Sequence, residues 1–310
     1  MNRTARSRGV SALVPVLGVA IGVAGVAFVV RTLVHRWDEV TDAFSRADAA
    51  PLAGSLLLGL AAMTLIGALW VRMLQSRGHH APHMRAMSWY YVGQLGKYVP
   101  GGIWPIVGRA ELAVRGGIPR GDAYRATGMS LMTTYAAATV AIALGALSST
   151  SYLPVGGAVV TGLGTVWFVL GSAQVTDKVS ALVLRVTKRT VTFPDRRRFF
   201  VLTAAHVPSW LLMSLSTSVT AHAFGATISP LRMLFITSLS WLAGFVVVGV
   251  PGGIGVRESI FTALAGSTVG TPVAVSLALV SRVVFIAVDI VGAALSSAVA
   301  TASRATSAER

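Results

Sequence analysis

Long uncharged apolar stretches alternate with short polar segments along the chain. Residues 9–30 and 49–71 contain no charged side chain, and the uncharged stretch at 126–176 is about twice as long. Because about 20 helical residues cross the hydrocarbon core of a bilayer, each stretch is long enough for one span and the longest for two. The pattern predicts an all-α polytopic membrane protein of about six full spans. The expected spans lie near 10–31, 50–72, 123–147, 153–172, 199–225 and 272–300.

Two further apolar regions, near 86–115 and 231–270, are interrupted by the same five residues, VPGGI. The string occupies 99–103 in the first region and 250–254 in the second. Proline lacks an N–H and paired glycines favour irregular backbone, so each copy should end one helix and let a half-helix begin after it. Irregular backbone at membrane depth is tolerated where it is buried in protein or lines a wet cavity. We therefore expect two re-entrant broken-helix hairpins.

Loop charge predicts the side from which each hairpin enters, because Lys and Arg concentrate in cytoplasmic loops. The N-terminal segment is basic, the segment at 35–48 has more acidic than basic side chains, and the loop at 177–198 holds seven Lys or Arg against two Asp. If the first VPGGI region crossed the membrane completely, this strongly basic loop would lie outside. The first hairpin is therefore expected to enter from the cytoplasm, the second from the outer face, and both termini to be cytoplasmic.

The two VPGGI copies are 151 residues apart, from 99 to 250. The same shift places the second and third spans within the fifth and sixth, and the first span roughly onto the fourth. We expect a single transmembrane domain, residues 1–310, built from two repeats at about 10–147 and 153–300. With three full crossings in each unit, the second unit is inverted relative to the first. Paired broken helices in an inverted repeat point to a transporter binding site.

Composition agrees with a membrane protein and excludes several kinds of site. Only 12% of the residues are charged, against roughly a quarter in soluble domains. The chain has no cysteine, which excludes disulfides and thiolate sites. The net charge of +15 is interpreted as cytoplasmic loops facing anionic lipid rather than nucleic acid. The N-terminal apolar stretch is about twice the usual 7–15 residues of a signal peptide and lacks an A-x-A site, so it is expected to be an uncleaved first span.

Each hairpin tip is a candidate anion site. The free N–H groups at the start of a half-helix attract anions, and arginine suits bidentate contact with phosphate. Both breaks are followed by an arginine and a glutamate, and the last span contains Arg282 and Asp289. We expect these residues to hold an anionic lipid headgroup. The predicted site comprises Lys97, Pro100, Gly101, Gly102, Arg109, Glu111, Pro251, Gly252, Gly253, Arg257, Glu258, Arg282 and Asp289.

Other roles for the same charged residues remain open at the level of sequence. In one alternative, Arg257 forms an ion pair with Glu258 or Glu111 and only stabilises the fold. Lys97 either contacts a phosphate or extends to the cytoplasmic surface. Arg282 and Asp289 are seven residues apart and share a helix face, so they pair with each other or with the hairpins.

No catalytic or metal-binding motif is present among those with a known mechanism, including the Walker loop, HExxH and G-x-S-x-G. His206 and His222 lie in one expected span, but 16 residues of helix separate them by about 24 Å, too far for joint metal binding. We expect a protein without enzymatic activity, metal ion or cofactor.

The segments GQLGKYVPGGIWPIVGRAEL and GVPGGIGVRES, followed by a span with SRVV, resemble the lysylphosphatidylglycerol synthase transmembrane-region family, which includes flippase-like integral membrane proteins. The resemblance covers nearly the whole chain. Trp104 and Pro105 depart from shorter versions of the first motif. The residues that match the family pattern are Gly96, Pro100, Gly101, Gly108, Arg109, Pro251, Gly252, Gly253, Gly255, Arg257, Glu258 and Arg282.

The resemblance implies a lipid-translocating membrane protein. The chain ends about ten residues after the last expected span, so we expect the translocating half without the soluble synthase domain. The leading hypothesis is a flippase in a bacterial-type cytoplasmic membrane that moves an anionic phospholipid or a polyprenyl-phosphate-linked glycan lipid. The alternatives are a non-transporting partner of an envelope glycosyltransferase or lipid synthase, and a membrane-embedded transferase that uses lipid phosphates. The transferase needs a base, for which Glu111 and Glu258 are the candidates.

Overall fold

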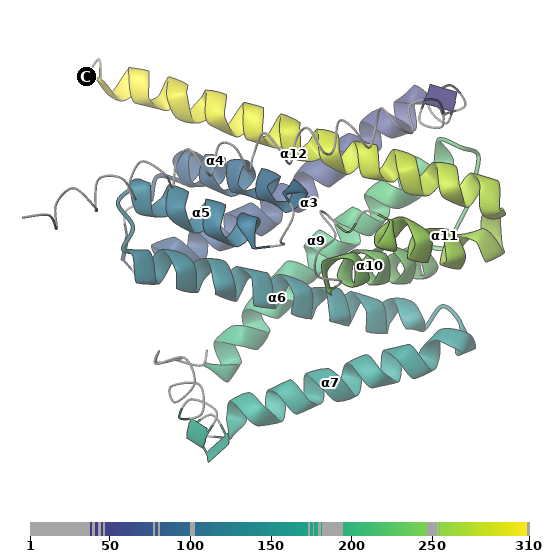
Figure 1. Cartoon of the computed structure of the whole chain (residues 1–310), viewed down its shortest axis with the longest axis horizontal. Coiled ribbons are helices and arrows are strands. Elements are labelled where there is room, and N and C mark those ends of the chain that lie inside the picture. Colours follow the sequence, from purple (N-terminus) through teal and green to yellow (C-terminus); the bar gives the residue numbers. More distant parts are fainter. Residues whose placement is uncertain are drawn as a thin grey trace, which may run out of the picture.

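The computed structural model describes residues 38, 41–42, 45, 47–76, 78–79, 81–99, 103–172, 174–175, 177–178, 181, 195–246, 253 and 255–308. In this part of the chain every regular element is a helix (Figure 1). The elements are α3 (Ala49–Gln75), α4 (His83–Gln94), η1 (Leu95–Tyr98), α5 (Trp104–Arg115), α6 (Arg120–Ala146), η2 (Thr150–Tyr152), α7 (Leu153–Gly171), α9 (Arg196–His222), α10 (Pro230–Val246), α11 (Val256–Val269) and α12 (Thr271–Ala308).

Five stretches in the described part are long and apolar enough to cross a membrane, namely α3, α6, η2 with α7, α9 and α12. They coincide with five of the six expected spans, and the all-α polytopic membrane fold is confirmed. α12 continues eight residues beyond the expected end of the last span, because neither Gly nor Pro interrupts the chain between Ala293 and Ala308. The expected first span at 10–31, the tip residues Pro100, Gly101, Gly102, Pro251 and Gly252, and most of the loop at 177–198 lie outside the described residues.

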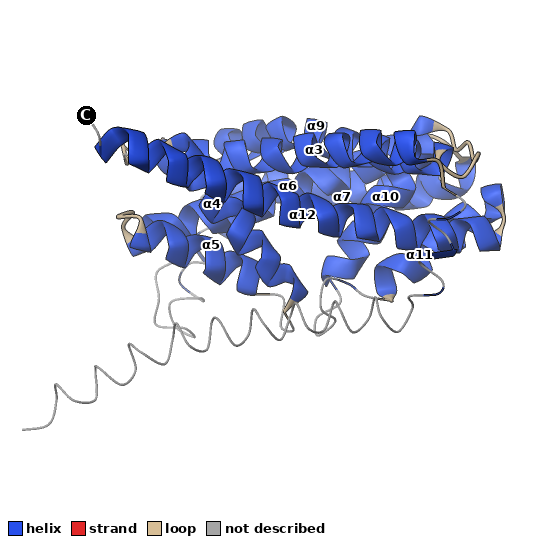
Figure 2. Cartoon of the chain, turned by 90° about the horizontal axis from the view of Figure 1, so that it is seen from above, coloured by secondary structure: helices blue, strands red, loops and turns tan. Residues whose placement is uncertain are grey.

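Two helix pairs form the expected broken-helix hairpins. α4 and η1 lead into the first break and α5 leaves it, while α10 and α11 flank the second. Within each pair the two helices pack against each other. The pairs lie at opposite ends of the molecule, and the ends of α5 and α11 that adjoin the breaks face the middle (Figures 1 and 2). Pro105 is tolerated in the first turn of α5, where its missing N–H has no intrahelical partner to lose.

α3 and α9, which the 151-residue shift makes equivalent, run antiparallel. At one end the Asp48 N–H donates to the Ala223 carbonyl over 2.9 Å, and at the other the Arg198 guanidinium donates to the Ser76 hydroxyl over 2.8 Å. Between them the hydroxyl groups of Ser55 and Ser216 each donate to the other's carbonyl, over 2.9 and 2.8 Å. Equivalent helices of opposite direction are what an inverted repeat requires.

Helix packing follows the same symmetry. The first helix of each hairpin packs against the last helix of the other unit, α4 on α12 and α10 on α6. α6 begins at Arg120 and α12 at Thr271, which are 151 residues apart. The inverted repeat is therefore present in the helices that the structure describes. The repeat's full extent stays a prediction, because the first unit is expected to begin at residue 10, outside them.

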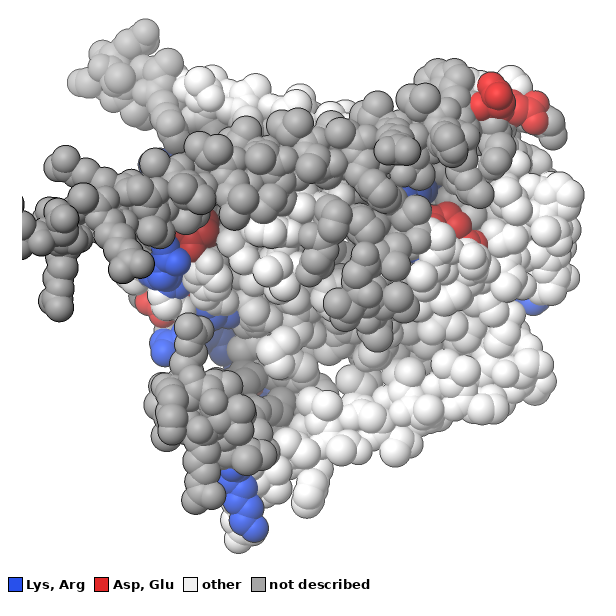
Figure 3. Space-filling view, in the orientation of Figure 1, with Lys and Arg blue, Asp and Glu red and all other residues white. Residues whose placement is uncertain are grey.

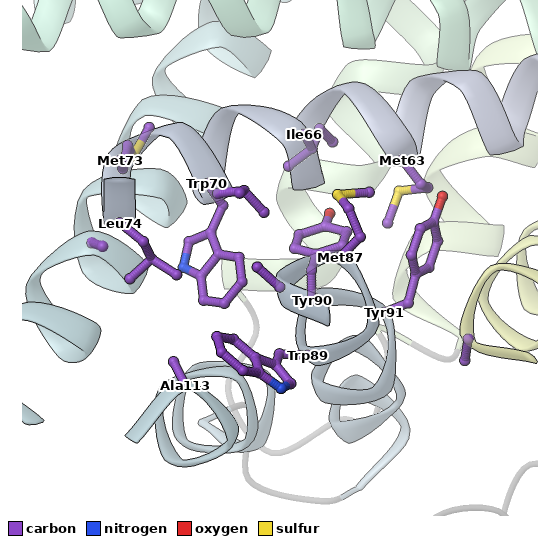
Figure 4. Packing of buried hydrophobic residues seen from close by; sticks show 14 of the residues in the cluster. Met63, Ile66, Trp70, Met73, Leu74, Met87, Trp89, Tyr90, Tyr91 and Ala113 are labelled. Carbon is purple, nitrogen blue, oxygen red and sulfur yellow. The ribbon is translucent and has the colours of Figure 1, made fainter. Parts of the chain in front are cut away.

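Large aromatic and sulfur-containing side chains pack the first hairpin against α3. Trp70 and Met63 of α3 face Tyr90 and Met87 of α4, and Trp89 lies between α3 and α5 (Figure 4). Trp70 and Tyr90 are completely buried. The hydrophobic effect does not drive helices together in a bilayer, because the lipid tails are themselves apolar. Close packing of side chains therefore supplies the free energy of helix association. It fixes η1, and thus the approach to the first break, in the middle of the bundle.

Charged residues gather at one end of the molecule. Most of the Lys and Arg visible in Figure 3 lie at the end where α3 finishes and α6 starts. Described basic residues at that end include Arg72, Arg115, Arg120 and Arg125, whereas Asp48 lies at the opposite end of α3. This distribution is the one that loop charge predicts.

Candidate functional site

The two hairpins converge on one indole ring, that of Trp241 in α10. The Lys97 ammonium, from η1 just before the first break, lies 5.5 Å from the ring centroid. The Arg257 guanidinium, from the first turn of α11 just after the second break, lies 4.0 Å from it. Aromatic faces attract cations, most strongly where water is excluded. Two cations that are 160 residues apart in the sequence therefore lie against the same indole ring.

Asp289 of α12 holds the tip of the first hairpin. Its carboxylate is completely buried, and one oxygen accepts a hydrogen bond from the Tyr98 hydroxyl over 2.5 Å and pairs with the Lys97 ammonium over 2.5 Å. The other carboxylate oxygen has no hydrogen-bond partner among the described residues. Lys97 therefore neither extends to the surface nor stands free. It is held by a carboxylate of the other repeat.

Glu258 occupies the start of α11. Its carboxylate accepts a hydrogen bond of 2.6 Å from the Gly255 N–H and forms an ion pair with Arg282 of α12. Gly255 has a φ of +86°, a conformation that suits glycine. The negative charge also complements the positive end of the helix dipole. The helix end that the sequence assigns to a ligand is thus capped by the protein's own carboxylate.

Arg282 and Asp289 both pair with hairpins and not with each other. Arg282 binds Glu258 of the second hairpin, and Asp289 binds Lys97 and Tyr98 of the first. Of the two pairings that the sequence left open, the structure has the second. Residues of α12 therefore bind described residues that flank both breaks.

Arg257 is buried without a carboxylate partner. It is 9% exposed, and its guanidinium lies over Trp241 and, at 5.6 Å, over Phe285. Among the described residues it makes neither an ion pair nor a hydrogen bond, because Glu258 is turned to Arg282. The alternative in which Arg257 pairs with Glu258 or Glu111 is therefore absent from the structure.

Arg109 is the corresponding arginine of the first hairpin, three residues after the position to which the 151-residue shift maps Arg257. It is 4% exposed and lies 5.1 Å from the Tyr90 ring centroid, while its Nε donates to the Pro105 carbonyl over 3.1 Å. Tyr90 and Trp241 are 151 residues apart, so each arginine lies over the equivalent aromatic residue of its own hairpin.

Two glycines at the same spacing let the hairpin helices approach. A Cβ on Gly93 would lie 2.4 Å from the Arg109 Cγ, and one on Gly244 would lie 3.3 Å from the Arg257 Cβ. Gly93 and Gly244 are also 151 residues apart. In both hairpins, glycine on the first helix thus sets the position of the arginine on the second. Gly253, next to the second break, has a φ of +67° and packs against Gly244.

Glu111 lies apart from the cluster around Trp241. Its carboxylate pairs with Arg120 over 2.7 Å and accepts a hydrogen bond from the Tyr124 hydroxyl over 2.7 Å. Both partners belong to the first turns of α6. Glu111 thus ties α5 to α6 at the basic end of the molecule, and the structure does not bring it to the other predicted site residues.

The sequence motifs do not identify four aromatic residues of the site, namely Tyr90, Tyr98, Trp241 and Phe285. The signal that points to two of them is the repeat itself, because a shift of 151 residues superposes Tyr90 on Trp241. Tyr98 adjoins Lys97, but nothing in the sequence shows that its hydroxyl reaches Asp289. Within the described residues, no group of three or more His, Asp or Glu is arranged to hold a metal ion.

The family model of the lysylphosphatidylglycerol synthase TM region matches residues 16–292. The match includes both hairpins and α12 as far as Gly292. The chain belongs to the lysylphosphatidylglycerol synthase TM region family. Membership in this family, together with the five candidate spans, identifies a multi-pass integral membrane protein connected with lipids. A comparison with curated proteins gives no match.

Proposed function

We propose that this member of the lysylphosphatidylglycerol synthase TM region family is a flippase that moves an anionic phospholipid or a polyprenyl-phosphate-linked glycan lipid between leaflets. The observation that supports this most directly is the position of Arg257. It is a buried guanidinium where the two opposed hairpins approach each other, and no described carboxylate forms an ion pair or hydrogen bond with it. A lipid phosphate is the complementary group.

The energetics favour an anion at this place. A buried charge without a partner costs several kcal/mol, and charged residues within a membrane protein usually face a partner or a cavity. The Trp241 ring offsets part of that cost, by roughly 2 kcal/mol in a desolvated setting. A phosphate offers bidentate charge-assisted hydrogen bonds, which are the strongest that a guanidinium makes. A bound headgroup phosphate thus provides the ion-pair partner that the Arg257 guanidinium lacks among the described residues.

Three neutral donors without a described partner lie on α10, the helix that carries Trp241. The Trp241 indole N–H and the hydroxyl groups of Thr237 and Ser238 are buried on α10 and have no hydrogen-bond partner among the described residues. Phosphate oxygens accept hydrogen bonds from such groups. We assign these donors, with Arg257 and Lys97, to the headgroup, and Arg109 with Tyr90 to its passage along the first hairpin.

The arrangement of the hairpins supplies a route between leaflets. They lie at opposite ends of the molecule, and the described ends of α5 and α11 that adjoin the breaks face its middle (Figure 2). Transporters built from inverted repeats expose a central site to one side and then the other as the repeats move. In the proposed cycle the headgroup is held at the tips while the acyl or prenyl chains stay in the bilayer.

We place the protein in a bacterial-type cytoplasmic membrane with both termini inside. The gathering of described Lys and Arg at the end that holds Arg72 and Arg120 supports this orientation. The first hairpin then opens toward the cytoplasm and the second toward the outer face.

A membrane transferase is less well supported than a flippase. Its base would be Glu111 or Glu258, and both carboxylates are engaged in ion pairs, with Arg120 and Arg282 respectively. A flippase needs no base, since it forms and breaks no covalent bond.

Reconstitution into liposomes tests the proposal. Headgroup-labelled phosphatidylglycerol or polyprenyl phosphate is placed in one leaflet, and its arrival in the other is followed with a membrane-impermeant reagent. The expected result is movement by the wild type, a loss of at least about tenfold for Arg257→Ala, and no loss for Arg115→Ala, which alters an exposed arginine of α5. Equal rates for wild type and Arg257→Ala would exclude the assigned site. No movement by the folded wild type would favour the non-transporting partner.

A further inference from the structure

Arg232 lies near the start of α10, at the end of the molecule opposite the one where most described Lys and Arg gather. The end is fixed by the hydrogen bond between the Asp48 N–H and the Ala223 carbonyl, because α10 begins at Pro230, seven residues after Ala223. Arginine is depleted on the outer side of membrane proteins. The 151-residue shift maps Arg232 onto Ala81, so the repeat does not require an arginine here. Its presence at this end therefore indicates a local role.

The Arg232 guanidinium contacts neutral groups of two other elements. Its Nη2 donates to the Tyr152 hydroxyl of η2 over 3.2 Å and to the Ser267 hydroxyl of α11 over 3.1 Å. It also lies 5.7 Å from the centroid of the Tyr152 ring. Among the described residues Arg232 forms no ion pair, and its Nε is buried without a hydrogen-bond partner. The side chain is half-buried, so its charge is partly shielded from water and not balanced by a carboxylate.

The start of α10 adds to this positive charge. The free N–H groups at the beginning of a helix carry a partial positive charge, which disfavours a nearby cation and favours an anion. The first turn of α10 contains no acidic residue that would offset it. An anion bound beside Arg232 would stabilise both the guanidinium and the helix end.

The Tyr152 hydroxyl supplies a second donor at the same place. Its ring is stacked on Phe235 of α10, with centroids 4.3 Å apart and planes 7° from parallel, which fixes the direction of the phenol. The oxygen accepts from Arg232, so its O–H is left to donate to another group. The Ser267 O–H, in contrast, donates to the Leu264 carbonyl over 3.0 Å. A guanidinium and a hydroxyl that share one edge match the oxygens of a phosphate.

Exposed leucines adjoin these two residues. Leu231 precedes the arginine and is 46% exposed, Leu153 follows the tyrosine and is 47% exposed, and Leu147 on the α6–η2 connection is 67% exposed. The ends of α6 and α10 are in contact here, since a Cβ on Gly145 would lie 2.8 Å from the Leu231 carbonyl oxygen. Polar donors beside exposed apolar side chains fit a molecule with a phosphate headgroup and acyl chains better than free phosphate.

We infer that Arg232 and Tyr152 bind the phosphate of a lipid in the leaflet at the Asp48 end, which is the outer leaflet in the proposed orientation. The site is separate from the cluster around Trp241, because nine residues, or about 14 Å of helix, lie between Arg232 and Trp241. It lies at the base of the second hairpin, where α10 begins and α11 ends. The inference goes beyond the proposed function, since the site binds lipid whether or not the protein moves it.

Photocross-linking at the site tests the inference. p-Benzoylphenylalanine replaces the exposed Leu153, the full chain in detergent is titrated with phosphatidylglycerol or with diacylglycerol of the same acyl chains, and cross-linked lipid is counted by mass spectrometry. We expect phosphatidylglycerol to bind about tenfold more tightly than diacylglycerol. Arg232→Gln should weaken phosphatidylglycerol binding by a similar factor, while Arg115→Gln, at the opposite end, leaves it unchanged.

Two further variants separate lipid binding from a purely structural role of Arg232. Tyr152→Phe keeps the ring on Phe235 and removes only the O–H, so it should weaken binding by about threefold or more. Ser267→Ala removes a neutral partner of Arg232 but keeps the charge, so it should change binding by less than about twofold. Size-exclusion profiles identify the folded variants. Equal losses in Ser267→Ala and Arg232→Gln would show that Arg232 only joins α10 to α11, and would overturn the inference.

The remaining outcomes are equally direct. Equal cross-linking of phosphatidylglycerol and diacylglycerol by the wild-type site overturns the inference without recourse to any variant, and so does unchanged binding by folded Arg232→Gln. Displacement of the lipid by an excess of inorganic phosphate would assign the site to free phosphate instead of a lipid, whereas unchanged cross-linking supports the lipid. None of these measurements involves movement between leaflets, so they can fail while the flippase function stands, or succeed while it fails.

Discussion

The ammonium nitrogen of Lys97 lies 2.5 Å from a carboxylate oxygen of Asp289, and this ion pair joins the first hairpin to the last helix of the second repeat. The carboxylate and the Lys97 ammonium nitrogen are buried, although the Lys97 side chain as a whole is 18% exposed. Position 138, which the 151-residue shift makes equivalent to Asp289, is an alanine. The two repeats therefore match in the arrangement of their described helices but not in charge, and α12 forms ion pairs with a described residue beside each break.

Asp289→Asn should destabilise the protein by about 3–5 kcal/mol, because it leaves the Lys97 ammonium buried without a counter-charge. The double variant Lys97→Met with Asp289→Leu should recover much of this loss, since apolar residues of similar volume replace a buried pair at little cost. Reversible unfolding in an SDS titration measures both. A double variant no more stable than Asp289→Asn would show that packing, and not charge, sets the contribution of this pair.

Gly93→Ala should cost about 1–3 kcal/mol of stability, because its Cβ would lie 2.7 Å from the backbone nitrogen of Arg109, which cannot move without α5. Gly244→Ala should cost less, since its nearest contacts are at 3.3 Å. Gly128→Ala in α6 is the control, because nothing lies within 4 Å of the added methyl group. It should be neutral or stabilise by roughly 0.5–1 kcal/mol. The same SDS titration ranks the three variants, and a loss at Gly128 as large as that at Gly93 would contradict the proposed close approach.

Glu258→Gln should tighten the binding of phosphatidylglycerol by about threefold or more, because it removes a negative charge beside Arg257 and frees Arg282 from its ion pair. The same variant should be less stable than the wild type, since it removes the ion pair between Glu258 and Arg282. Glu111→Gln is the matched control, because Glu111 pairs with Arg120 away from the Trp241 cluster. Native mass spectrometry compares the three proteins. A weaker affinity in Glu258→Gln, or the same gain in Glu111→Gln, would argue against this placement of charge.

The orientation of the helices predicts a pattern of chemical labelling. The chain has no cysteine, so single cysteines can be introduced without background. Thr150→Cys and Thr227→Cys lie in the connections α6–α7 and α9–α10, at the same end as Asp48, and should react with an impermeant reagent added outside cells. Gly121→Cys at the start of α6 should react only after the membrane is opened. External labelling of Gly121→Cys with protection of Thr150→Cys would reverse the proposed orientation.

Much of the architecture is readable from the chain because it depends on neighbouring residues. Runs of about 20 apolar residues specify spans, and Pro-Gly-Gly interrupts a helix wherever it occurs. The shift of 151 residues also places Tyr90 on Trp241 and Gly93 on Gly244, although the motifs alone direct attention to neither pair. The hairpins, five of the spans and the inverted repeat were accordingly predictable.

The partners of the charged residues were not predictable in this way. Glu258 adjoins Arg257 in sequence, yet its carboxylate turns to Arg282, 24 residues away. Helical geometry explains the choice, because consecutive residues on a helix do not face each other. Glu111 follows the first break as Glu258 follows the second, but it pairs at the basic end of the molecule.

A bundle of membrane helices with two matched breaks follows from the amino-acid sequence, because span length and backbone interruption are local properties of the chain. The contacts of Asp289 with Lys97 and with Tyr98, the latter 191 residues away, follow from the fold, as does the absence of an ion-pair partner for Arg257 among the described residues. Such pairings depend on which helices become neighbours and on the direction of each side chain at their contact. Those are set by packing across the whole bundle, and it is this packing that leaves the buried Arg257 guanidinium without an ion-pair partner among the described residues.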